Sequence, residues 1–116
     1  MLSVPPSVRI YVCASPTDMR KSFDGLAALA RQVVNEDPLS GHLFVFCNRR
    51  TDRVKVLWWD RTGLALWYKR LEEGSFCFPV RGAERYEMES GELALVLQGV
   101  DLERTRGHPT FKLSRP

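Results

Sequence analysis

Two different spacings of apolar residues open the chain. Every second residue from Val8 to Val12 is apolar, which predicts a β-strand over residues 7–14. From Phe23 to Val34, apolar residues recur at spacings of three and four, which predicts an amphipathic helix that ends near Asn35. We therefore expect the fold to begin with a strand followed by a helix.

The start of this helix has two interpretations. Thr17 and Asp18 are residue types that cap helix N-termini, so either would start a long helix. Gly25 would then lie inside it, where glycine costs about 1 kcal/mol relative to alanine. Either the helix begins near Ser22, or close packing at Gly25 requires a residue without a side chain.

Short segments rich in aromatic and β-branched residues follow, at residues 43–48, 54–59 and 64–70. The connectors between them are polar and of hairpin length, so we expect an antiparallel meander. A fourth short strand is predicted at residues 76–78, and it ends at Pro79. Together these segments indicate a small sheet of about four to five strands.

The C-terminal third is predicted to contain one more helix. Residues 80–89 have no clear period and are expected to form a loop, after which Ser90 is a candidate N-cap. The helix would end at Gln98, with Gly99 as its left-handed C-cap. We predict an α+β fold with two helices packed on one face of the meander, forming a single domain over residues 1–103. Residues 104–116 would form an extended basic tail.

Composition favours a soluble globular protein. The chain has 116 residues, of which 44% are hydrophobic and 27% charged, which argues against wholesale disorder. No apolar run approaches the roughly 20 residues needed to span a bilayer, and no secretory signal is recognisable at the N-terminus, so a cytoplasmic location is expected. Cys13, Cys47 and Cys77 lie in apolar surroundings without paired spacing, which predicts buried, inert thiols.

The charges are segregated along the chain. Residues 41–70 carry a net charge of +5, residues 71–103 a net charge of −6, and residues 104–116 a net charge of +4. Such alternation favours one surface for a polyanion and another for a basic partner, or a self-complementary arrangement.

Catalytic chemistry finds little support in the sequence. Asp18, Asp24 and Asp60 are the candidate carboxylates for a two-metal site. However, the first two lie at the expected helix start, where acids interact favourably with the helix dipole. His42 and His108 are isolated, and a His42/Cys47 pair would point to opposite faces of a strand. Because a glycine-rich phosphate loop is also missing, we predict no enzyme activity, no catalytic residue, no metal site and no cofactor.

The basic turns of the meander are the better functional candidates. They interleave with aromatic residues that are either stacking platforms or core residues: Trp58, Trp59, Trp67 and Tyr68. Nucleic acid, a protein partner and ordinary solvated turns are all compatible with these cations. The candidates for nucleic-acid contact are Arg49, Arg50, Arg53, Lys55, Arg61, Lys69 and Arg70, together with Arg20 and Lys21 at the expected helix start.

An acidic stretch is the candidate surface for a basic protein partner. Its members are Glu84, Glu87, Glu89 and Glu92.

Four collinear blocks of the sequence resemble one known family. Thr17-Asp-Met-Arg-Lys-Ser-Phe-Asp-Gly-Leu-Ala-Ala-Leu29 is similar to the N-terminal signature of the accessory protein called TnpB, or Orf2, of IS66-type insertion sequences. The other blocks that resemble this family are residues 37–46, residues 54–60 together with 63–71, and residues 93–101. The resemblance implies a bacterial transposition protein that assists a separate transposase, and it supplies no catalytic residues.

Three functions follow as hypotheses. The first is a non-catalytic accessory protein that binds element DNA, the transposase, or both. The second is a pure protein-interaction module that contacts the transposase and another accessory protein of the same element without touching DNA. The third is a small nuclease, which the sequence gives no site to support.

Overall fold

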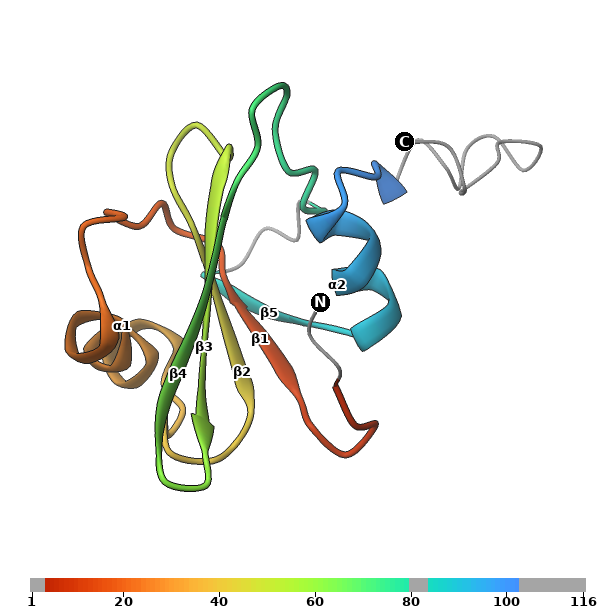
Figure 1. Cartoon of the computed structure of the whole chain (residues 1–116). Helices are drawn as coiled ribbons and strands as arrows, with labels where there is room; N and C mark the ends of the chain where they lie inside the picture. Colours follow the sequence, from red (N-terminus) through yellow and green to blue (C-terminus); the bar gives the residue numbers. More distant parts are fainter. Residues whose placement is uncertain (1–3, 80–83, 103–116) are drawn as a thin grey trace.

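One sheet of five strands forms the centre of the protein. The computed structural model describes residues 4–79 and 84–102, and within them the strand order is β4-β3-β2-β1-β5 (Figure 1). The strands are β1 (Ile10–Cys13), β2 (Leu43–Cys47), β3 (Arg53–Asp60), β4 (Gly63–Arg70) and β5 (Arg85–Met88). The α+β class and the strand number are confirmed.

The sheet is mixed rather than purely antiparallel. Strands β2, β3 and β4 form the predicted antiparallel meander. Strand β1, however, pairs parallel with β2 and antiparallel with β5. A parallel pair needs a crossover connection, and the helical segment between β1 and β2 supplies it.

The helices cover opposite faces of the sheet. Helix α1 (Phe23–Leu29) continues into a π-helical turn, η1 (Ala30–Val34), on one face, and α2 (Ser90–Leu97) lies on the other (Figure 1). The expectation that both helices share a face was wrong. The apolar run of β2 explains why, since Phe44 and Phe46 are buried under α1 whereas Val45 belongs to the core under α2. A strand buried on both faces needs a cover on each side.

Three boundaries differ from the sequence-based prediction. Residues 76–78 join no strand, although Phe76 is buried and its N–H donates to the carbonyl of Thr51 at 2.6 Å. Strand β5 falls in the segment predicted to be a loop, because its pairing with β1 depends on tertiary contact rather than on local pattern. The N-cap of α2 is Glu89, not Ser90.

Helix α1 settles the alternative at its start. It begins at Phe23 with Ser22 as N-cap, so Thr17 and Asp18 are not capping residues. A Cβ on Gly25 would also lie 3.2 Å from Cβ of Lys21, so the close packing predicted there exists as well. Gly99 has φ +89° and closes α2 as predicted. The predicted tail, residues 104–116, lies outside the described residues.

Candidate nucleic-acid interface at one end of the sheet

The turn between β2 and β3 is organised by the side chain of Asn48. Its Oδ1 accepts hydrogen bonds from the backbone N–H groups of Asp52 and Arg53, each at 3.1 Å, and its Nδ2 donates to Asp52 at 2.6 Å. This last bond is the main reason that the pKa of Asp52 lies below its ordinary value. Thr51 takes φ +55°, which lets the chain reverse. The result is a braced turn that holds Arg49 and Arg50 on the surface.

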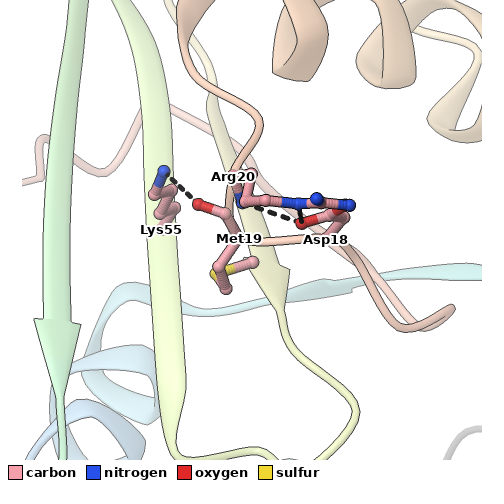
Figure 2. A network of polar contacts seen from close by, with 4 residues as sticks. All are labelled: Asp18, Met19, Arg20 and Lys55. Atoms are coloured by element: carbon pink, nitrogen blue, oxygen red, sulfur yellow. Dashed lines mark hydrogen bonds and ion pairs between the residues drawn. The ribbon is translucent and has the colours of Figure 1, made fainter.

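The loop after β1 lies against this turn. The N–H of Thr17 donates to the carbonyl of Cys47, the last residue of β2, at 2.7 Å, and Thr17 itself is buried. Asp18 accepts from the backbone N–H of Arg20 at 2.9 Å and from its guanidinium at 2.7–3.1 Å (Figure 2). These bonds from Arg20 lower the pKa of Asp18 from 3.8 to about 2. The Arg20 side chain is thus oriented while remaining 91% exposed.

A buried lysine holds the same loop onto the sheet. Lys55 is only 6% exposed, and its Nζ donates to the carbonyl oxygen of Met19 at 2.8 Å (Figure 2). The same Nζ also donates to the carbonyl oxygen of Lys21 at 2.7 Å. A buried ammonium needs such partners, because its desolvation is costly. Lys55 was among the predicted nucleic-acid contacts, but its charge is used inside the protein, so we assign it a structural role.

Loop and turn together line a hollow, called here the basic groove. Its lining residues are Thr17, Asp18, Met19, Arg20, Asn48, Arg49, Arg50, Asp52 and Arg53. Four arginines therefore converge from two segments about 30 residues apart, against the two carboxylates of Asp18 and Asp52. The groove carries a net positive charge and presents guanidinium groups, which suit phosphate oxygens.

A second hollow adjoins the groove and shares Arg53 with it. Arg53, Tyr68, Arg70 and Glu72 line this hollow. Arg53 donates to the Tyr68 hydroxyl at 3.3 Å, and Arg70 pairs with Glu72 at 2.9 Å. Arg53 and Arg70 are register partners on neighbouring strands, which explains why they meet here.

Other predicted cations lie elsewhere. Arg61 is in the β3–β4 turn at the opposite end of the hairpin (Figure 1). Lys69 faces α2, where its Nζ donates to the carbonyl of Leu97 at 2.8 Å and so satisfies one end of that helix. Lys21 is exposed just ahead of α1. Of the predicted basic set, only Arg20, Arg49, Arg50, Arg53 and Arg70 are therefore gathered around the two hollows.

The aromatic candidates divide in the same way. Trp58 and Trp67 pack against the core under α2, and Trp59 is partly buried, so all three are less exposed than Tyr68. Tyr68 is different, since it is 47% exposed.

The acidic candidates are spread over β5 and the start of α2. Glu89 and Glu92 form a capping box, in which the N–H of Glu89 donates to Glu92 at 3.2 Å. Glu87 lies 4.0 Å from Arg9, and Glu84 is exposed before β5. Part of this acidic stretch thus has a structural use, and a partner surface there remains a prediction.

No catalytic arrangement is visible among these groups. Within residues 4–79 and 84–102, His, Cys, Asp and Glu side chains form no group of three or more that would hold a metal ion. Cys13 is buried and Cys47 and Cys77 are partly buried. Burial raises the pKa of all three thiols, for Cys47 to about 12, so they stay protonated at neutral pH.

Sequence reasoning missed one residue that shapes the site, Asn48, and predicted another, Lys55, in a different role. Asn48 directly precedes a polar turn, a position where its side chain commonly bonds the backbone. Lys55 interrupts an otherwise apolar strand, which signals a charge with an internal partner. Neither pattern reveals which backbone segment the side chain meets.

Comparison with known proteins supports the resemblance noted in the sequence. A family model described as "IS66 Orf2 like protein" matches residues 8–107. The chain belongs to this family. It is therefore an accessory protein of an insertion sequence, from a family that is not known as catalytic.

Two relatives come from Sinorhizobium fredii (strain NBRC 101917 / NGR234). The uncharacterized protein y4jC is 35% identical over 109 residues, covering 94% of this chain and 93% of the relative. The uncharacterized protein y4hO is 36% identical over 101 residues, covering 87% and 88%. No solved structure matches the chain significantly. In the described part of the chain, no helix has the length and apolar character to cross a membrane.

Proposed function

We propose that this accessory protein holds the phosphate backbone of element DNA in the basic groove and so assists the transposase at the element. The observation that carries the proposal is the convergence of Arg20 with Arg49, Arg50 and Arg53. Guanidinium groups bind phosphate oxygens in a bidentate manner, and several together follow a charged backbone.

The rigidity of the groove supports the same proposal. Asn48 braces the turn and Lys55 holds the loop in the free protein. On binding, only the arginine side chains would therefore lose conformational freedom, which keeps the entropy cost low. Contacts to phosphate position a protein on DNA and carry little sequence information. The accessory protein would thus fix the geometry of the complex, while the transposase reads the ends and performs the chemistry.

The test compares two triple variants with equal charge loss. Arg49→Ala/Arg50→Ala/Arg53→Ala empties the groove of three cations, whereas Arg9→Ala/Arg31→Ala/Arg61→Ala removes three that do not line it. Fluorescence anisotropy with labelled terminal-repeat DNA at low salt should show affinity at least about tenfold lower for the groove variant, with the control near the parent. Equal losses in the two variants would mean that net charge, not the groove, drives binding.

The protein-interaction alternative gives a different result. A parent protein that binds no DNA, yet co-purifies with the transposase equally before and after nuclease treatment, would replace the DNA proposal with a direct protein contact.

A further inference from the structure

Tyr68 is the one candidate aromatic side chain left open to solvent beside the arginines. It lies on β4 and is 47% exposed, whereas the three tryptophans of the same hairpin are partly buried. Tyr68 and Trp67 are neighbours on β4 and point to opposite faces of the sheet, so Trp67 packs against the core under α2, whereas Tyr68 lies on the other face beside Lys55.

Two contacts hold the side chain of Tyr68 in place, one to a face of its ring and one to its hydroxyl. The Nζ of Lys55 lies 4.7 Å from the ring centroid, in the range of a cation–π contact. The hydroxyl accepts the hydrogen bond from Arg53 at 3.3 Å. One face of the ring therefore contacts the buried ammonium of Lys55, while the residue as a whole is 47% exposed.

Arginine side chains flank this ring. Arg53 and Arg70 line the same hollow as Tyr68, and Arg53 also lines the basic groove. A chain whose phosphates follow the groove arginines would reach Tyr68 at Arg53, which lines both hollows. Stacking faces interleaved with cations are the usual design for binding single-stranded nucleic acid.

We infer that Tyr68 is a stacking platform for an unpaired DNA base, and that the groove takes a single strand in preference to a duplex. This inference rests on the proposed function, because the arginines supply the phosphate contacts. Bases in a duplex are stacked on each other and present no free face to a side chain, whereas bases of a single strand do.

The test measures single-strand and duplex binding in parallel. Labelled 20-nucleotide oligo-dT and a blunt 20-base-pair duplex are titrated with the parent, Tyr68→Ala and Tyr68→Phe. The parent should bind oligo-dT more tightly than the duplex. Tyr68→Ala should lose about 5- to 100-fold in affinity for oligo-dT and change less than about twofold for the duplex. Tyr68→Phe keeps the ring and should stay within about twofold of the parent. Phe23→Ala, at another exposed aromatic residue outside both hollows, serves as the control.

Each alternative outcome is informative. If Tyr68→Ala binds oligo-dT like the parent while the groove triple variant fails to bind, the groove proposal stands and the stacking inference is wrong. Equal losses on both DNA forms would also overturn it, because a stacked base cannot explain a duplex effect. A parent that binds neither DNA would overturn both proposals.

Photocrosslinking gives an independent check. When 5-iodouracil replaces a thymine in the oligonucleotide, the crosslink to the protein should map to Tyr68.

Discussion

Replacing Lys55 with methionine should loosen the loop that carries Arg20 and destabilise the protein. Methionine keeps the apolar stem in its buried position but leaves the carbonyls of Met19 and Lys21 without their donor. Two hydrogen bonds from a charged donor contribute about 1.5–3 kcal/mol each, and removing the desolvation cost of the ammonium offsets part of this, so a net loss of about 2 kcal/mol is expected.

Urea denaturation followed by circular dichroism measures this loss. With a slope of about 1–3 kcal/mol per molar, the unfolding midpoint of Lys55→Met should fall by about 1 M. Arg61→Met removes an exposed cation from the far turn and should stay within about 0.5 kcal/mol of the parent. Hydrogen exchange should also quicken at the amide of Lys21, which donates to the carbonyl of Asp18. Unchanged unfolding and unchanged exchange would refute the role of Lys55 in holding the loop.

Three further predictions concern other parts of the structure. Gly99→Ala forces a side chain into φ +89° and should cost about 1 kcal/mol in urea denaturation, whereas Gly91→Ala, which meets no atom within 4 Å, should not destabilise. The Asp18 carboxyl should titrate near pH 2 by NMR in the parent and at a higher pH in Arg20→Ala, still below its ordinary 3.8 because the backbone N–H of residue 20 keeps donating to it. Because the pKa of Asp18 is lowered in the fold, its pair with Arg20 stabilises the protein above pH 3.8, and this contribution is lost as the pH falls through about 2. An Asp18 titration midpoint that is the same in Arg20→Ala as in the parent would contradict the pairing. The Cys47 thiol, with its pKa raised to about 12, should react with a disulfide reagent at pH 8 at least about 100-fold more slowly than free cysteine, and a rate similar to that of free cysteine would disprove its burial.

The residue pattern within each segment was enough to predict the meander and the two helical segments. The strands of the meander β2-β3-β4 are rich in aromatic and β-branched residues, and both helical segments have apolar residues at the predicted spacing, so their bounds agree with the prediction to within a few residues. Strand β5 has no such period, because its pairing with β1 determines its conformation. The positions of the two helices also could not be derived locally. The unbroken apolar run of β2 is typical of a strand buried on both faces, but it does not say which helix covers which face.

The candidate site was predictable by residue type and only partly by position. Arg49, Arg50 and Arg53 are neighbours in sequence, so their clustering followed from one turn. The approach of Arg20 depends on the parallel pairing of β1 with β2, which places the two loops at the same end of the sheet. Lys55 looked like a surface cation because its two acceptors are backbone carbonyls more than 30 residues away.

The salt dependence of DNA binding tests the central claim most directly. Anisotropy titrations with element-end DNA over a range of salt concentrations give the slope of log affinity against log salt for the parent and the two triple variants. If the groove holds phosphates, Arg49→Ala/Arg50→Ala/Arg53→Ala should reduce the magnitude of that slope by about 2 to 3, while Arg9→Ala/Arg31→Ala/Arg61→Ala should retain the parent slope. Parallel lines for the parent and both variants would contradict a phosphate-binding groove.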